Sequence, residues 1–319
     1  MTVREAAALL RQKDNILILT HRRPDGDTMG CAAGLCAALR QLGKRAWVLE
    51  NPEATELNGY YAAPYLAPAD AAPDFVVSVD IAARQLFFPA AEKYLDRVDL
   101  AIDHHPSQEF FARETCLEAN RAACGEIVYA ICRELGEITR EIALPLYAAV
   151  ATDTGCFVYA NTTANTHQVA AALMETGIDY FFVNKRHFRT KSRRRMKLEA
   201  DMVEHMEFFD QGRGVFMAVP LSLMESLQAT EEDAEDLSSL AGLIEGTDCG
   251  AVLRQLPGGD WKLSLRTGAN GRVNATQVCR KLGGGGHAMA AGATIPGTLE
   301  EVKEKIRTAV AETLAESEG

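Results

Sequence analysis

The feature that most constrains this sequence is a repeated pattern in its first half, in which short apolar runs end directly in aspartate or histidine. The runs cover residues 16–20, 75–79 and 98–102, and the residues that follow them are His21, Asp80 and Asp103. Short continuous apolar runs predict strands buried on both faces. Helix-like segments lie between and after the strands, at residues 28–43, 124–135, 142–152 and 166–176. Strands that alternate with helices predict an α/β fold with a mainly parallel sheet.

Acidic and imidazole side chains are expected to meet at one edge of this sheet. All strands of a parallel sheet end at the same edge, where open α/β folds bind ligands. Four segments place candidate residues there: His21, Asp25 and Asp27; Asp80; Asp103, His104 and His105; and Asp153 after a helix-like segment. So many carboxylates repel one another unless a cation lies among them.

The donor types indicate which cation is expected. Aspartate oxygens with imidazole nitrogens and no thiolate favour Mn²⁺ or Mg²⁺ over Zn²⁺. The number of ligands fits two metal ions bridged by one carboxylate better than a single ion. Two-metal sites typically activate a water for in-line displacement at phosphorus.

Each motif alone has a simpler interpretation. A turn at residues 25–27, a solvated histidine pair at 104–105 and a helix cap at Asp80 are the alternatives. An EF-hand loop is excluded because Met29 and Cys36 stand where the third ligand and the closing glutamate would be. All of these motifs fall at the ends of predicted strands or helices, which favours a shared metal site over the separate interpretations.

Charge and composition exclude several classes of protein. With 33 Lys and Arg against 44 Asp and Glu, the net charge is −11, which argues against a protein that coats long duplex nucleic acid or a membrane. The sequence has neither a signal-peptide pattern nor an apolar stretch long enough to span a membrane. The eight cysteines include no Cys-x-x-Cys, so reduced buried thiols are favoured over disulfides or zinc ligands. A cytoplasmic protein is expected.

A basic run divides the chain. Residues 185–197 contain eight Lys or Arg and no acidic residue. We expect a first domain over residues 1–184, a helical linker over 185–212 and a second domain over 213–319. The basic run is interpreted as part of a solvated linker helix, with steering of an anionic substrate as the alternative.

The second domain carries a candidate anion site at residues 283–287, four glycines followed by His287. Glycines let backbone N–H groups turn towards an anion, although a flexible turn is the alternative. The Gly-Lys-Ser/Thr of a P-loop is missing. Arg266, at the end of a strand-like run, is a candidate for bidentate phosphate contact. In the first domain, Phe157 is a candidate for base stacking, with core packing as the alternative.

Together these motifs resemble the DHH phosphoesterase superfamily. The resemblance rests on His21-x-x-x-Asp25-x-Asp27, Asp80, Asp103-His104-His105 and Asp153. The glycine-rich motif with His287, followed by residues 290–292 (AAG), resembles the DHHA1 domain of the same proteins. Length and layout are similar to the branch of oligoribonucleases (nanoRNases) and pAp phosphatases.

The resemblance implies the architecture and the role of each residue. The fold is expected to be an N-terminal DHH domain with a mainly parallel, Rossmann-like sheet and a smaller C-terminal α/β DHHA1 domain with a mixed sheet, joined by a helical linker. One metal would be held by His21, Asp25 and Asp80, and the other by Asp27, Asp80, His104 and Asp153. Catalysis would also need His105 facing the scissile phosphate and Asp103 orienting the histidines. The nucleotide would contact Arg266, Gly284, Gly285, Gly286 and His287.

The predicted function is hydrolysis of short oligoribonucleotides to mononucleotides and dephosphorylation of 3′-phosphoadenosine 5′-phosphate (pAp) to AMP. A hydroxide activated by two metal ions, Mn²⁺ first and Mg²⁺ second, would attack phosphorus. The alternatives are a cyclic- or linear-dinucleotide phosphodiesterase, a family II pyrophosphatase, which lacks the glycine-rich histidine motif, and a non-catalytic nucleotide-binding protein. A homodimer is left open.

Overall fold

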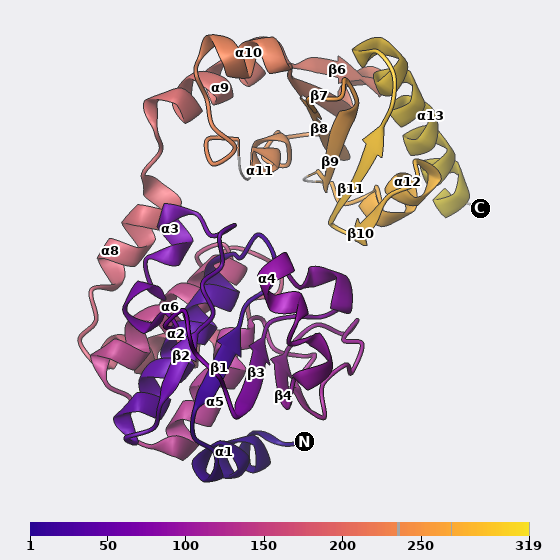
Figure 1. Cartoon of the computed structure of the whole chain (residues 1–319). Helices are drawn as coiled ribbons and strands as arrows, with labels where there is room; N and C mark the ends of the chain where they lie inside the picture. Colours follow the sequence, from indigo (N-terminus) through magenta and orange to yellow (C-terminus); the bar gives the residue numbers. More distant parts are fainter. Residues whose placement is uncertain (235–236, 269, 319) are drawn as a thin grey trace. The chain divides into compact units, whose positions relative to one another are not determined.

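The computed structural model describes residues 1–234, 237–268 and 270–318. The chain forms two compact units, residues 1–190 and 191–319, which are described separately (Figure 1). The division between Thr190 and Lys191 falls inside the segment 185–212 that was expected to be a linker.

The first unit is built on a five-stranded sheet in the order β2-β1-β3-β4-β5. Its strands are β1 (Ile16–Leu19), β2 (Ala46–Val48), β3 (Phe75–Val79), β4 (Leu100–Asp103) and β5 (Glu114–Leu117). Every neighbouring pair is parallel, which confirms the predicted parallel α/β sheet. Strand β5 was not predicted, because its sequence ETCL is partly exposed and has no continuous apolar run.

Alternate residues of the central strands enter two different cores, as expected for a sheet covered on both faces. Ile16 and Ile18 of β1 join the larger core, whereas Leu17 and Leu19 join the other. The larger core is formed with the long helices of the unit, which are α1 (Val3–Gln12), α2 (Gly26–Gln41), α5 (Cys124–Leu135), α6 (Arg140–Asp153) and α7 (Ala164–Glu175). The short helices are α3 (Glu56–Gly59), α4 (Pro89–Glu92) and α8 (Tyr180–Asn184).

Helices α2 and α6 pack so closely that a side chain on Gly30 or Gly26 of α2 would collide with α6. A Cβ placed on Gly30 would lie 2.3 Å from the carbonyl oxygen of Pro145, and one placed on Gly26 would lie 2.5 Å from the side chain of Thr152. The contacts run in opposite directions along the two helices, so they are antiparallel. The N-terminus of α2 therefore lies beside the C-terminus of α6.

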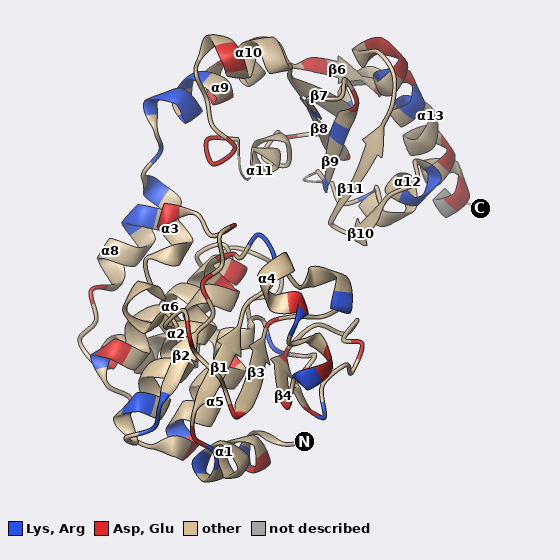
Figure 2. Ribbon diagram, viewed as in Figure 1, with Lys and Arg blue, Asp and Glu red and all other residues tan. Residues whose placement is uncertain are grey.

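A helical segment connects the two units. After α8, residues Lys185–Arg189 form a π-helical turn, and Ser192 caps α9 (Arg193–Glu204). In Figure 2 much of the ribbon of this segment is blue, the colour of Lys and Arg. Several are paired, because both Lys191 and Arg195 contact Glu199.

The second unit contains a six-stranded sheet in the order β10-β11-β9-β8-β7-β6. Its strands are β6 (Glu207–Phe209), β7 (Gly214–Val219), β8 (Cys249–Gln255), β9 (Trp261–Thr267), β10 (Gly285–His287) and β11 (Ala290–Ile295). Only β7 and β8 are parallel among the described pairs, so the sheet is mixed, as predicted. Strand β6 lies in the segment expected to be a linker, and part of the expected glycine-rich turn is the edge strand β10.

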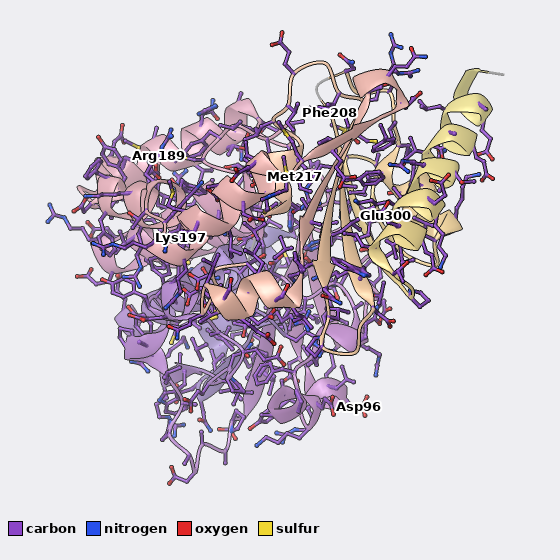
Figure 3. All side chains as sticks on the ribbon, turned by 90° about the horizontal axis from the view of Figure 1, so that it is seen from above. Asp96, Arg189, Lys197, Phe208, Met217 and Glu300 are labelled. Atoms are coloured by element: carbon purple, nitrogen blue, oxygen red, sulfur yellow. The ribbon has the colours of Figure 1, made fainter. Side chains whose placement is uncertain are left out.

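Helices pack on both faces of this sheet. On one face, α12 (Ala275–Lys281) and α13 (Leu299–Glu318) pack over Leu263 and Leu265. On the other face, α9, α10 (Leu221–Ser226) and α11 (Ser238–Ala241) pack over Met217 of β7. Figure 3 labels Met217 and also Lys197 of α9. Within the described ranges, no helix combines the length and the apolar composition needed to cross a bilayer.

Candidate metal centre

The carboxyl end of the first sheet gathers the predicted residues. His21 lies just beyond β1, Asp80 directly follows β3, and Asp103 ends β4. Asp25 caps α2 through its side chain, which accepts from the N–H groups of residues 27 and 28. The remaining members are Asp27 in the first turn of α2, His104 and His105 after β4, and Asp153 at the end of α6.

Three overlapping groups of possible metal ligands lie here: His21 with Asp25 and Asp80, then Asp27 with His104 and Asp153, and finally Asp80 with His104 and His105. In the first group, His21 Nε2 lies 3.6 Å from Asp25 Oδ1 and 3.7 Å from Asp80 Oδ2. In the second group, His104 Nε2 lies 4.0 Å from Asp27 Oδ2 and 3.6 Å from Asp153 Oδ2. The other oxygen of Asp80, Oδ1, lies 3.5 Å from His104 Nε2. Asp80 thus presents one oxygen to each group.

The histidines of both groups direct the same nitrogen at the carboxylates. His21 Nδ1 is 2.8 Å from the carbonyl oxygen of Arg22, and His104 Nδ1 is 3.1 Å from that of Arg121. A carbonyl only accepts, so each Nδ1 donates its proton. In its neutral form, each ring then keeps its Nε2 lone pair for the carboxylate side.

Burial makes the ionised carboxylates costly in the absence of a cation. Burial, together with the charge of Asp25, raises the pKa of Asp27 to about 7. Burial, together with the charge of Asp27, raises the pKa of Asp153 to about 7. Asp80 is 3% exposed, and burial and the charge of Asp27 raise its pKa well above the usual range. Its Oδ1 has no hydrogen-bond partner.

These residues fit divalent cations. The Nε2 atoms of His21 and His104 lie 3.5–4.0 Å from carboxylate oxygens, longer than a usual hydrogen bond. A cation in each group would satisfy the unpartnered oxygen of Asp80 and offset the charge that raises the pKa values. Oxygen and nitrogen donors without thiolate suit Mn²⁺ or Mg²⁺.

Asp27 is held by an element that the sequence did not associate with the site. Its carboxylate accepts from the backbone N–H of Cys124 at 2.7 Å and of Gly125 at 2.9 Å, at the N-terminus of α5. The thiol of Cys31 contacts the same carboxylate at 3.2 Å. The unsatisfied N–H groups of a helix N-terminus favour a carboxylate. No sequence signal pairs residues so far apart in the chain.

His105 lies beside the two groups and is held by Asp103. Its Nδ1 is 2.8 Å from Asp103 Oδ1, and its ring is partly exposed. Burial alone would lower the pKa of His105, but the hydrogen bond to Asp103 and the charges of the surrounding carboxylates together raise the pKa. Because Nδ1 donates to Asp103, Nε2 is the ring atom that remains for a ligand.

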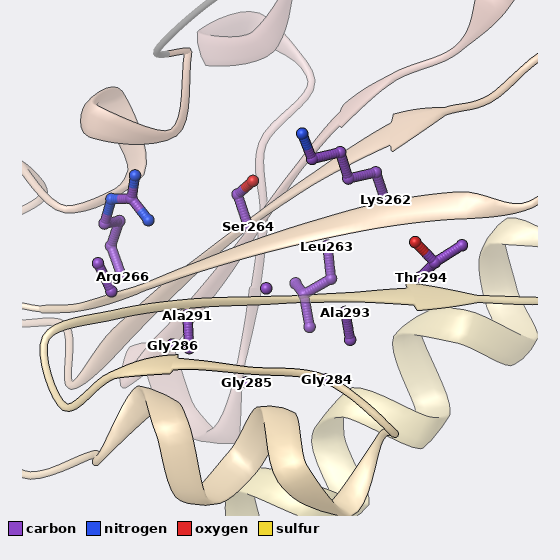
Figure 4. A pocket seen from close by; sticks show the side chains of 12 residues that line it. Lys262, Leu263, Ser264, Arg266, Gly284, Gly285, Gly286, Ala291, Ala293 and Thr294 are labelled. Carbon is purple, nitrogen blue, oxygen red and sulfur yellow. The ribbon is translucent and has the colours of Figure 1, made fainter. Parts of the chain in front are cut away.

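In the second unit, part of the predicted substrate set lines one pocket. This pocket of ≈ 580 Å³ is lined by Arg266 and by the glycines at 284, 285 and 286, with Lys262 and Ser264 on the same strand. Figure 4 shows Lys262, Ser264 and Arg266 on one side of β9. Sequence analysis had not selected Lys262 and Ser264, although their period-two spacing with Arg266 places all three on one face of a strand.

The two other predicted substrate residues lie elsewhere. His287 is the last residue of β10, is exposed, and is not among the residues that line this pocket. Phe157 is partly buried in the first unit, where its ring stacks on His167 at 5.4 Å and packs against Tyr147. Their roles stay predictions.

Comparisons with known proteins find similarity over nearly the whole chain. The model of the DHH family, N-terminal domain, matches residues 15–150, and that of the DHHA1 domain matches residues 223–316. The chain is 34% identical to a bifunctional oligoribonuclease and PAP phosphatase NrnA of Thermus thermophilus, over 94% of this chain and 90% of that protein. A protein of the same name from Bacillus subtilis is 24% identical over 88% and 90%.

Two further similarities are more distant. The cyclic-di-AMP phosphodiesterase PdeA of Listeria monocytogenes is 21% identical over 95% of this chain, but the match spans 48% of that protein. The crystal structure of an exopolyphosphatase-related protein from Bacteroides fragilis has a TM-score of 0.88, with 21% identity and coverage of 99% and 98%. The second similarity concerns the fold.

Proposed function

Because this chain belongs to the DHH family of phosphoester hydrolases and also carries a DHHA1 domain, we propose that it hydrolyses short oligoribonucleotides to mononucleotides and dephosphorylates pAp to AMP. The observation that supports this proposal most directly is that Asp80 lies between two ligand groups, with one oxygen near His21 and the other near His104. Relatives that match over nearly the whole chain are named for these two activities.

In this proposal, one cation is held by His21, Asp25 and Asp80, and the other by Asp27, Asp80, His104 and Asp153. Mn²⁺ is the proposed ion, with Mg²⁺ as the second candidate, on the basis of the oxygen and nitrogen donors. When bound, such ions lower the pKa of water and polarise a phosphoryl oxygen.

The residues of the chain supply the rest of the chemistry. Backbone N–H groups of α5 fix Asp27, and carbonyl groups fix the ring planes of His21 and His104. Asp103 holds the Nδ1 proton of His105, so that Nε2 can contact the phosphate and stabilise the charge that develops there. Preorganised donors of this kind act without rearranging during the reaction.

We assign nucleotide binding to the second unit. The Arg266 guanidinium forms no ion pair within the described part of the chain, and its one hydrogen bond is a long one, 3.4 Å to the carbonyl oxygen of Leu265. It can therefore bind a phosphate, with the glycine backbone of β10 alongside. The domain boundaries at 184/185 and 212/213, and any homodimer, also stay proposals.

A second candidate function is the hydrolysis of linear or cyclic dinucleotides. The match to the Listeria cyclic-di-AMP phosphodiesterase covers most of this chain, which supports testing it. A panel with Mn²⁺ should compare di- to pentaribonucleotides, long RNA, pAp, pyrophosphate, pApA and cyclic di-AMP. The proposal expects the highest kcat/KM on the shortest RNAs and on pAp. A strong preference for the cyclic or linear adenosine dinucleotide would favour the second candidate.

Single-residue variants can distinguish the residues of the metal centre from those that bind the nucleotide. Asp153→Ala should abolish the hydrolysis of every substrate, because Asp153 belongs to the second ligand group. Arg266→Ala and His287→Ala should lower kcat/KM for a dinucleotide about ten- to hundredfold, the loss expected for a charge-assisted phosphate contact. Hydrolysis of bis-p-nitrophenyl phosphate, which has no nucleoside, should change much less. Equal losses on both substrates would contradict the assignment of Arg266 and His287 to nucleotide binding.

A further inference from the structure

Gln108 is a buried amide that joins the ends of two strands beside the metal centre. It is 5% exposed and lies in the loop that follows His105. Its Nε2 donates to Asp103 Oδ2 at 2.6 Å and to the carbonyl oxygen of Ile81 at 2.8 Å. Its Oε1 accepts from the N–H of Phe110 at 3.1 Å. Both protons of the amide and one lone pair of its oxygen are thus used.

The amide determines which oxygen of Asp103 is left for His105. Asp103 is fully buried, and its Oδ1 accepts from the backbone N–H groups of His104 and His105 as well as from the His105 ring. Gln108 is the hydrogen-bond partner of the opposite oxygen. A carboxylate fixed at both oxygens cannot rotate, so the direction of its bond to the His105 ring is fixed too.

We infer that Gln108 is a positioning residue that acts on the reaction through Asp103 and His105. This inference rests on the proposed function, in which His105 Nε2 contacts the scissile phosphate. Without the amide, Asp103 Oδ2 would be a buried carboxylate oxygen with no donor, and the Asp103 side chain would reorient towards another donor. The ring of His105 would then lose its fixed plane, whereas the ligands of both metal groups would keep theirs.

Gln108→Met is the variant of choice, because methionine fills a similar volume and forms no comparable hydrogen bond. Removing the partner that orients an active-site histidine typically costs about 10- to 100-fold in activity, and we expect that loss in kcat. KM for a dinucleotide and the affinity for Mn²⁺, measured by titration calorimetry, should stay within about twofold of wild type. A residue of purely structural importance would not separate kcat from metal affinity in this way.

A double-mutant cycle tests whether Gln108 acts on kcat through His105. In a His105→Ala background, Gln108→Met should lower kcat by less than a further twofold, because its target is already absent. A full second loss, or a loss of Mn²⁺ affinity in parallel with kcat, would overturn the inference and assign Gln108 to the fold through Ile81. Wild-type kcat in Gln108→Met would overturn it as well.

A spectroscopic measurement on the metal-free protein does not depend on any substrate. The hydrogen-bonded Nδ1–H of His105 should give a downfield proton resonance, identified by its absence in His105→Ala. Gln108→Met should shift or broaden this resonance, and an unchanged resonance would overturn the inference. The matched control is Tyr147→Phe, which removes another largely buried hydrogen bond of the first unit, to Asn184, and should leave the resonance and kcat unchanged. If wild type hydrolysed nothing in the panel, the proposed function would fail while the resonance still reported on Gln108.

Discussion

Asp80→Asn should stabilise the metal-free protein while it removes the function. Asp80 Oδ1 is buried without a partner, and the neighbouring carboxylates make its charge still more costly. An amide in its place removes the charge and offers an N–H to His104 Nε2, which lies 3.5 Å from Oδ1. The backbone of Asp80 has φ of 58°, a conformation that asparagine tolerates better than most residues, so the exchange adds no strain.

The expected gain in stability is estimated from the cost of leaving Asp80 Oδ1 without a hydrogen-bond donor. A buried acceptor without a donor costs about 1–3 kcal/mol, and a charged one costs more, so a gain of about 2 kcal/mol at pH 8 is a conservative expectation. For a unit of 190 residues, that gain raises Tm by roughly 4–8 °C. Scanning calorimetry of protein stripped with EDTA measures it. Added Mn²⁺ should raise the Tm of wild type but not that of Asp80→Asn, and kcat should fall by orders of magnitude in the variant.

The same Asp→Asn exchange should lower the stability of the protein at a carboxylate that already has hydrogen-bond donors. Asp233 is 5% exposed and accepts from Ser192, Arg194 and Thr230, which hold its pKa at about 2 despite the cost of burial. Asp233→Asn should therefore destabilise the protein by about 2 kcal/mol at neutral pH. A metal-free Asp80→Asn protein with the same Tm as wild type, or a lower one, would refute the reasoning about the unpartnered oxygen.

Two further predictions concern pH and packing. The folded-state pKa values of Asp27 and Asp153 are raised to about 7, so the two carboxyls take up protons on folding. As far as these groups determine it, the stability of the metal-free protein should be greatest below about pH 4 and should fall as the pH rises to about 7. Urea midpoints across this range should show the fall, and saturating Mn²⁺ should flatten it; an equal slope with and without Mn²⁺ would exclude these carboxyls as its origin. Gly30→Ala should cost about 1–3 kcal/mol, because its Cβ would meet a backbone carbonyl oxygen, whereas Gly34→Ala meets the movable side chain of Leu146 and should cost less. Equal urea midpoints for the two alanine variants would contradict that ranking.

Much of the site could be predicted because parallel strands end at a common edge. Asp80 and Asp103 could be placed from their apolar runs alone, and the division of the ligands into two groups followed from the family resemblance. The N-terminus of α2 lies two residues before the expected start, because Asp25 caps it. Asp25 therefore caps the helix and also belongs to the candidate site.

What the sequence did not predict depends on long-range contacts or on weak local patterns. The N–H groups that bind Asp27 belong to Cys124 and Gly125, far along the chain, and only the folded sheet brings them together. Gln108 has no spacing that marks it out. Strand β10 consists of Gly285, Gly286 and His287, whose local preferences favour a turn; pairing with β11 overrides that preference.

The close packing of α2 and α6 also fixes the distance between two carboxylates of the candidate site. Asp27 lies at the start of one helix and Asp153 at the end of the other, so the spacing between them depends on how near the helix axes can come. At Gly30 the nearest atoms that a side chain would meet are the carbonyl oxygen of Pro145 and the Cβ of Ala149, which cannot move aside by changing rotamer. Thermal motion that loosens side-chain packing elsewhere in the unit would leave this distance nearly constant. A side chain added at Gly30 would instead push the two helices apart and lengthen the distance between the carboxylates.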